Sequence, residues 1–299
     1  MIPTGHIYSL EDASTNEIEK AFRKCHLISQ QAAGNFYYAF VFLPARQRRG
    51  IEALYAFCRA GDDLADEDEY TSAYDDKSGL LDNLRKKLDL CFDEKYCDGI
   101  TLALASAIQE FHFEREHFID LLKGIEMDLT ISRYETFNDL RTYCFRVASV
   151  VGLLCLKVFG CDNLRTRYYA EFVGIGMQMT NILRDLHEDY RRDRIYIPLE
   201  DLVRFNINER ELFEENNQTS LKELIVFECN RAREFYRLAE DSLVDSDRKP
   251  MYVARIMAAI YLELLKKIII NERLDKRIEL TVSEKMKIGR VLISRTLGA

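Results

Sequence analysis

The sequence predicts an all-α protein, and three observations lead to this prediction. Apolar residues recur with a helical period through most of the 299 residues. Only 4 prolines and 13 glycines interrupt that pattern. Hydrophobic residues make up 47% of the chain and charged residues 31%, which is the balance of a globular protein. We therefore expect a helical bundle without a β-sheet.

The expected helices follow one another with short connections. After a polar leader (1–14), the first covers 15–33, with Ser14, Thr15 or Asn16 as its N-cap. A run of aromatics follows at 36–42, and Pro44 opens a helix to about Ala65, because proline suits the first helical turn. The acidic stretch 68–79 predicts a loop. Further helices are expected at 80–93, 101–109, 114–123, 137–159, 163–191, 208–215, 219–244, 250–271 and 281–297. With no boundary between them, we expect one domain over residues 1–299.

Charge and cysteine content exclude some classes of protein. The net charge of −8 disfavours nucleic acid as a partner, since that binding needs a clustered positive surface. Eight cysteines without a C-x-x-C pair predict reduced thiols in the cytoplasm. The most apolar run, Val147 to Phe159, contains Lys157 and is shorter than the ~20 residues that span a bilayer. We expect a cytoplasmic protein, with peripheral membrane contact and oligomeric state left open.

The first carboxylate cluster lies at the end of the second expected helix. Tyr55, Arg59, Asp62 and Asp66 stand at i, i+4, i+7 and i+11, so they share one stripe of the helix. Two carboxylates one turn apart can bind Mg²⁺, which completes its shell with water and phosphate oxygens. The alternative is a solvated acidic helix end, which residues 66–69 resemble.

The second carboxylate cluster lies in the expected helix 163–191. Gln178, Asn181, Asp185 and Asp189 again share one stripe, among mostly apolar neighbours. Burying these side chains without partners would be costly, and a divalent metal removes the difficulty. A surface salt-bridge face is the alternative, but the apolar neighbours leave little solvated surface for it. The glycines at 174 and 176 predict a close approach of another segment, since each costs roughly 1 kcal/mol in a helix.

The two stripes together suggest one kind of chemistry. Two aspartate-bearing helices that face each other across a bundle could hold metal ions on a diphosphate. The metals and nearby arginines would then neutralise the charge of the departing diphosphate. An apolar, aromatic cavity would exclude water from a carbocation and stabilise it by cation–π contact.

Three ordered motifs are similar to those of a known family. They are DDLAD at 62–66 after YAFCR, YCFRVASVVGLLCLKV at 143–158, and GIGMQMTNILRDLHEDYRRDRIYIP at 174–198. The chain resembles the squalene/phytoene synthases, the head-to-head branch of the isoprenoid synthases. The resemblance also includes the stretches 36–49 and 250–261, so it covers most of the chain.

The resemblance implies an isoprenoid-synthase helical bundle with a central cavity, and a set of site residues. It implies Mg²⁺ held by Asp62, Asp66, Asp185 and Asp189, with Asp63 as a further contributor. It also implies a tyrosine, Tyr143, beside the developing cation or proton. The residues it assigns to prenyl diphosphate binding are Tyr55, Arg59, Gln178, Asn181, Arg184, Tyr261 and Arg277. The serines and basic residue that the family often has before the aromatic run are replaced by Gln31-Ala32-Ala33-Gly34-Asn35, so one diphosphate contact set is altered.

Several functions remain open on this basis. We favour condensation of two farnesyl diphosphates (C15) to presqualene diphosphate or squalene, with NADPH needed only for squalene. The closest alternative joins two geranylgeranyl diphosphates (C20) to phytoene. A terpene cyclase, or a catalytically silent subunit with a binding or assembly role, would be a different class of protein. His187 lies between the aspartates in sequence but about 160° from Asp185 around the helix, which predicts a flanking residue rather than a base.

Overall fold

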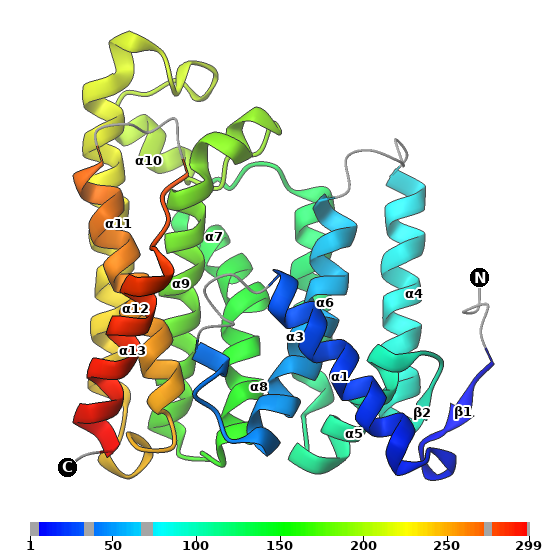
Figure 1. Cartoon of the computed structure of the whole chain (residues 1–299). Helices are drawn as coiled ribbons and strands as arrows, with labels where there is room; N and C mark the ends of the chain where they lie inside the picture. The colour runs from blue at the N-terminus through cyan, green and yellow to red at the C-terminus, as the bar shows by residue number, and fades with distance from the viewer. Residues whose placement is uncertain (1–5, 33–38, 67–73, 272–276, 298–299) are drawn as a thin grey trace. The chain divides into compact units, whose positions relative to one another are not determined.

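The computed structural model describes residues 6–32, 39–66, 74–271 and 277–297. At 32, 62, 64–66, 74–76 and 295–297 it describes the backbone alone. The chain divides into two compact units (Figure 1). The first comprises 1–129 and 154–161, and the second comprises 130–153 and 162–299.

The first unit is built from five helices of the described chain. They are α1 (Thr15–Ala32), α3 (Ala45–Asp66), α4 (Tyr74–Phe92), α5 (Gly99–Phe111) and α6 (Arg115–Thr130). The apolar helix α5 packs against α1, α3 and α4. Its start is fixed by Asp98, whose side chain accepts a hydrogen bond from the Thr101 backbone N–H in a capping box. Phenylalanines complete this core: the buried Phe118 ring is met edge-on by the rings of the buried Phe57 and the half-buried Phe92.

The described residues contain one small exception to the all-α prediction. Strands β1 (Tyr8–Ser9) and β2 (Lys95–Tyr96) pair antiparallel, and a 3₁₀ turn, η1 (Leu10–Asp12), follows β1. Part of the polar leader therefore has regular structure. The pairing is only two residues long, so the predicted all-α class is confirmed.

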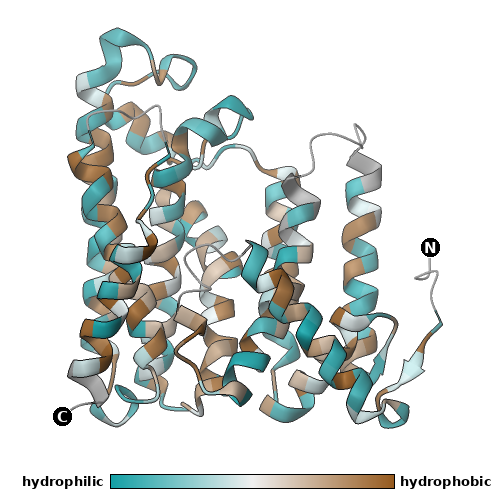
Figure 2. Cartoon of the chain, in the orientation of Figure 1, coloured by the Kyte–Doolittle hydropathy of each residue, from teal (hydrophilic) through white to brown (hydrophobic). Residues whose placement is uncertain are grey.

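The second unit is built from the remaining α-helices of the described chain and one π-helical turn. They are α7 (Phe137–Cys144), the π-helical turn η2 (Phe145–Ser149), α8 (Val150–Phe159), α9 (Leu164–Arg191), α10 (Leu199–Arg204), α11 (Gln218–Ser242), α12 (Tyr252–Ile270) and α13 (Val282–Leu297). The C-terminal part of α8 belongs to the first unit. Helix α9 packs along α11 and α12, and α13 packs on α12. Along α11 and α12, hydrophobic positions alternate with hydrophilic ones (Figure 2), as amphipathic helices require.

Helix α9 approaches the π-helical turn closely at Gly174. A Cβ atom there would lie 2.5 Å from the Ser149 Cα, so only glycine fits. The Ser149 hydroxyl also donates to the Glu171 carbonyl at 2.7 Å. At Gly176 a Cβ would meet the Tyr236 ring at 3.1 Å. The close approach predicted from these two glycines is confirmed.

Two expectations about elements are wrong. The segment predicted as a helix at 208–215 forms two separate 3₁₀ turns, η3 (Glu209–Glu211) and η4 (Glu215–Asn217). Asparagine side chains bond the backbone there: Asn208 accepts from the Arg210 N–H, and Asn217 donates to the Glu211 carbonyl. Such local bonds compete with the helical ladder. Helix α4 begins at Tyr74, inside the stretch predicted as a loop, because polar residues occupy its first turns and hide the apolar period.

Among the described residues, one helical stretch, Phe137–Phe159, is long and apolar enough to cross a membrane by length and composition. Half of its most apolar window is buried within the protein, and core helices of soluble proteins meet the same criteria. This finding is therefore compatible with the expected core helix. All eight cysteines are free thiols, and five of them are buried.

Candidate active site

Helix α9 carries the second predicted stripe. Asn163 caps its start by accepting a hydrogen bond from the Arg165 backbone N–H. In the second half of the helix, the Asn181 side-chain amide donates to the Gln178 side-chain carbonyl oxygen at 3.3 Å. The structure thus brings these two predicted residues into contact on the face that also bears Asp185 and Asp189.

Two features of this stripe fit a divalent cation. The side-chain oxygen of Asn181 is buried and has no hydrogen-bond donor among the described residues, although buried acceptors are almost always satisfied. Burial, followed by the charge of Asp185, raises the pKa of Asp189 to about 7. Mg²⁺ prefers carboxylate and amide oxygens, and it would relieve both the unmet acceptor and the carboxylate repulsion.

The described part of the chain does not contain a complete metal site. No group of three or more His, Cys, Asp or Glu side chains positioned to hold a metal is found there. The side chains of Asp62 and Asp66, two of the four predicted Mg²⁺ ligands, lie outside the described residues. Of the predicted ligands, the structure therefore describes the side chains of Asp185, Asp189 and the further contributor Asp63.

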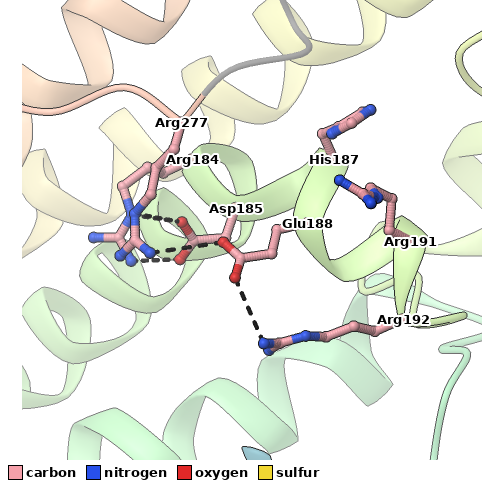
Figure 3. Close-up of a pocket in the computed structure, with 7 residues that line it drawn as sticks. All are labelled: Arg184, Asp185, His187, Glu188, Arg191, Arg192 and Arg277. Atoms are coloured by element: carbon pink, nitrogen blue, oxygen red, sulfur yellow. Dashed lines mark hydrogen bonds and ion pairs between the residues drawn. The ribbon is translucent and has the colours of Figure 1, made fainter. Parts of the chain in front are cut away.

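Asp185 is held by two arginines that the resemblance assigned to diphosphate (Figure 3). Arg184 forms a bidentate pair with it, and its Nε donates to Oδ1 at 2.8 Å. Arg277, which is 92 positions later in the chain, places its Nε 3.2 Å from the same Oδ1. Its Nη1 also lies 3.7 Å from Glu188. The structure thus unites Asp185, Arg184 and Arg277 in one cluster.

Arg184 is the most enclosed member of this cluster. Its side chain is 12% exposed and that of Asp185 is 19% exposed. Burial lowers the pKa of Arg184, but hydrogen bonds to Asp185 and Tyr261 and the charges of both outweigh it and raise the pKa. Tyr261 comes from α12 and is buried. Another residue assigned to diphosphate binding therefore lies against the cluster.

These side chains line a pocket of about 440 Å³ at the C-terminal end of α9. It is lined by Arg184, Asp185, His187, Glu188, Arg191, Arg192 and Arg277. Four guanidinium groups face two carboxylates, so the pocket is cationic although the whole chain carries −8. Such a lining attracts an anion with several oxygens, for which arginine provides matching donors.

The first motif lies on α3 in the first unit. Arg59 pairs there with Asp63, one helical turn later, with Nη2 2.6 Å from Oδ1. The two side chains are 37% and 49% exposed, so this solvent-accessible ion pair contributes little to stability. The Tyr55 ring packs edge-on against Phe40, with centroids 6.2 Å apart. Tyr55, Arg59 and Asp63 thus occupy one helix, as predicted.

Tyr143 belongs to a cluster of three tyrosine rings in the second unit. Its ring centroid lies 5.3 Å from that of Tyr196 and 5.5 Å from that of Tyr134. All three are buried. Backbone pairing between Arg133 and Ile195 brings Tyr134 and Tyr196 together, with the Ile195 N–H donating to the Ser132 carbonyl. Three aromatic faces provide negative potential that can stabilise a cation.

Sequence reasoning missed several residues of this region. Tyr134 lies between two helices, where periodicity gives no signal, and only the pairing with the segment after α9 reveals its place. Glu188, Arg191 and Arg192 are charged residues close to the aspartates in the sequence. The sequence does not show that they line one pocket. His187 was predicted to flank the site, and the structure places it in the pocket lining.

Comparison with known proteins is consistent across sequence and structure. The profile of the family described as Squalene/phytoene synthase matches residues 29–284. A 15-cis-phytoene synthase from Synechocystis is 36% identical over 235 residues, covering 75% of this chain and 69% of that protein. A phytoene synthase from Mycobacterium tuberculosis is 33% identical over 287 residues, covering 94% and 93%. A ligand-bound dehydrosqualene synthase structure superposes with a TM-score of 0.81 at 28% identity, covering 95% of this chain and 99% of that one.

Proposed function

Because the chain belongs to the squalene/phytoene synthase family, we propose that it joins two prenyl diphosphates head to head in a Mg²⁺-dependent reaction. Members of this family are prenyltransferase-type enzymes that bind prenyl diphosphates. One observation carries the proposal for this chain. Asp185 lines a pocket together with four arginines, and Asp189 and the buried, unmet oxygen of Asn181 each lie about one helical turn from Asp185 on α9.

The proposed roles follow from the chemistry of each side chain. Asp62, Asp66, Asp185 and Asp189 would hold Mg²⁺, with Asp63 as a further contributor, and the Asn181 oxygen would be a further ligand in the second carboxylate cluster. When bound, Mg²⁺ neutralises the charge that develops on a departing diphosphate. Arg184, Arg277 and Arg59 bind the diphosphate oxygens, and Tyr55, Gln178 and Tyr261 orient them.

The reaction proceeds in two stages. In the first, the C1–O bond of one prenyl diphosphate breaks and diphosphate leaves with the bonding electrons. The double bond of the second molecule attacks the allylic cation, and loss of a proton gives a cyclopropylcarbinyl diphosphate. In the second, that diphosphate leaves and the cation rearranges. Loss of another proton then gives phytoene or dehydrosqualene, whereas hydride from NADPH would give squalene.

The tyrosine cluster is proposed to stabilise the cations. Tyr143, Tyr134 and Tyr196 present aromatic faces that attract positive charge and exclude water, which would otherwise quench a carbocation. Tyr143 lies beside the developing cation or the departing proton in this proposal.

For chain length, the relatives favour the C20 alternative over the C15 substrate preferred from the sequence. The curated relatives reported above are named phytoene synthases. We therefore propose two geranylgeranyl diphosphates as substrates and phytoene as product. Two farnesyl diphosphates remain the second candidate, which the similarity to the dehydrosqualene synthase structure supports.

The test is incubation of the purified chain with Mg²⁺ and each diphosphate separately, with and without NADPH, followed by mass analysis of the hydrocarbon. We expect a C40 product from the C20 substrate that does not depend on NADPH. A C30 product from farnesyl diphosphate alone would instead establish the second candidate, and a change with NADPH would identify squalene.

Two other outcomes would contradict the proposal. No Mg²⁺-dependent diphosphate release with any C10, C15 or C20 substrate would indicate a catalytically silent subunit. A product containing the carbons of a single substrate molecule would indicate a terpene cyclase.

A further inference from the structure

The pocket extends beyond the metal-binding stripe to another flank of α9. His187 and Arg191 are separated by four positions, so they lie on the same flank, one turn apart. At about 100° per residue, His187 is roughly 160° and Arg191 roughly 120° from Asp185 around the helix axis. Figure 3 shows these two side chains beside each other, apart from the group of Asp185, Arg184 and Arg277.

These two residues differ from the other basic residues of the pocket in their partners. Arg184 and Arg277 contact Asp185, and Arg192 lies 3.6 Å from Glu188. Within the described residues, neither His187 nor Arg191 forms an ion pair or a side-chain hydrogen bond. Their donors therefore line the pocket without an anion to satisfy them.

Packing fixes the position of His187. Its ring meets Phe213 edge to face, with centroids 4.9 Å apart. Phe213 also packs against Tyr190 at 5.1 Å, and the Tyr190 hydroxyl donates to the Arg210 carbonyl at 2.8 Å. The segment around η3 is thus anchored on α9, which holds the imidazole in place without using its nitrogens.

We propose that His187 and Arg191 form a second anion subsite, which binds a phosphoryl group without Mg²⁺. Arginine offers two parallel N–H donors to phosphate, and a neutral imidazole still donates one N–H. A phosphoryl group has enough oxygens to accept from both side chains at once. The net positive lining of the pocket favours such an anion over a neutral ligand.

Two sources can supply this chemistry. One is inorganic diphosphate, the leaving group of the proposed reaction, and the use of this source rests on the proposed function. The other is the headgroup of an anionic phospholipid at a membrane surface. Both present phosphoryl oxygens to the same two donors.

The test uses the full chain without metal. Inorganic diphosphate is titrated calorimetrically in the presence of a chelator into the wild type, Arg191→Gln and His187→Phe. Phenylalanine retains the ring contact with Phe213 and removes the donors. Arg167→Gln is the control, because Arg167 is exposed on the same helix outside the pocket. In a second arm, each protein is floated with phosphatidylcholine vesicles that contain or lack phosphatidylglycerol.

We expect metal-free diphosphate binding to weaken about tenfold or more in both pocket variants, since each loses a charge-assisted or fixed donor, and to be unchanged in Arg167→Gln. If the two pocket variants lose only their binding to the phosphatidylglycerol vesicles, the subsite would be supported. The lipid headgroup would then be identified as the source of the bound phosphoryl group. The proposal is overturned if both pocket variants bind diphosphate and vesicles as the wild type does, or if the wild type binds neither. Failure of the proposed function would be seen separately, as absence of Mg²⁺-dependent turnover.

Discussion

At the scale of single residues, Asp185 has two roles that can be separated by substitution. Its carboxylate pairs with Arg184 and Arg277 and is a proposed Mg²⁺ ligand. Asp185→Asn keeps the shape and an acceptor for Arg184 but removes the charge. We expect Mg²⁺-dependent diphosphate release to fall at least about 100-fold, because metal stabilisation of a leaving group is worth several kcal/mol.

The measurement for Asp185→Asn is phosphate-coupled detection of released diphosphate across a Mg²⁺ titration. Asp241→Asn is the matched control, since Asp241 pairs with Arg237 on the exposed face of α11. Cooperative unfolding of both variants would show that the fold is intact. Turnover near the wild-type rate in Asp185→Asn would remove this aspartate from the site.

The sequence predicted which site residues share one helix better than it predicted their contacts with residues far away in the chain. Periodicity alone placed Asn181 and Asp185 on one stripe of α9. It could not relate Arg277 to Asp185, because 92 residues separate them and only the family resemblance linked them. Tyr134 also depends on a tertiary pairing. Angular position on the helix predicted that His187 flanks the site rather than acting as a base, and the structure places it in the pocket lining.

At the scale of elements, the contact between α9 and the π-helical turn depends on Gly174. An alanine Cβ would lie 2.5 Å from the Ser149 Cα, so the two segments would have to move apart. We expect Gly174→Ala to lower the free energy of unfolding by about 1–3 kcal/mol, the usual cost of overpacking. Gly79→Ala is the control: no atom lies within 4 Å of its Cβ, and it should gain up to about 1 kcal/mol of helix propensity. Urea unfolding measures both, and equal effects would disprove the close approach.

Element prediction succeeded where the apolar period is long and failed where local side-chain bonds decide. Helix α9 was predicted at 163–191 and spans Leu164–Arg191. The expected helix 208–215 is instead two 3₁₀ turns, because Asn208 and Asn217 bond the backbone. The short helix α10 was missed, although Pro198 directly before it is a common signal of a helix start.

At the scale of the whole molecule, composition predicted the class but not the distribution of charge. The net charge of −8 coexists with a cationic pocket on the second unit. The first carboxylate cluster lies in one compact unit and the second carboxylate cluster in the other. A single domain over the whole chain stays a prediction from the short connections. Periodicity cannot address it, because it describes each helix alone.

The stability of the molecule should depend on pH through a buried cluster of α10 and α11. Arg231 contacts Asp201 at 2.7 Å and Glu228 at 2.8 Å, and both carboxylates are buried. Burial, and less strongly the charge of Asp201, outweigh Arg231 and raise the pKa of Glu228 to about 8. The folded protein therefore binds this proton more tightly than the unfolded chain. The contribution of Glu228 to the free energy of unfolding is fully present below pH 4.5 and is lost as the pH rises to about 8.

Glu228→Gln tests this dependence, because glutamine resembles the protonated acid and does not titrate. In the wild type, the free energy of unfolding should fall by up to about 1.4 kcal/mol per pH unit within that window from this group alone. The substitution should flatten the profile and raise stability most at pH 8, where the wild type buries an extra charge. Glu223→Gln, at an exposed position of the same helix, controls for net charge. Urea unfolding from pH 5 to 8 gives the slopes, and parallel profiles for Glu228→Gln and the wild type would show that Glu228 is ionised in the folded protein throughout.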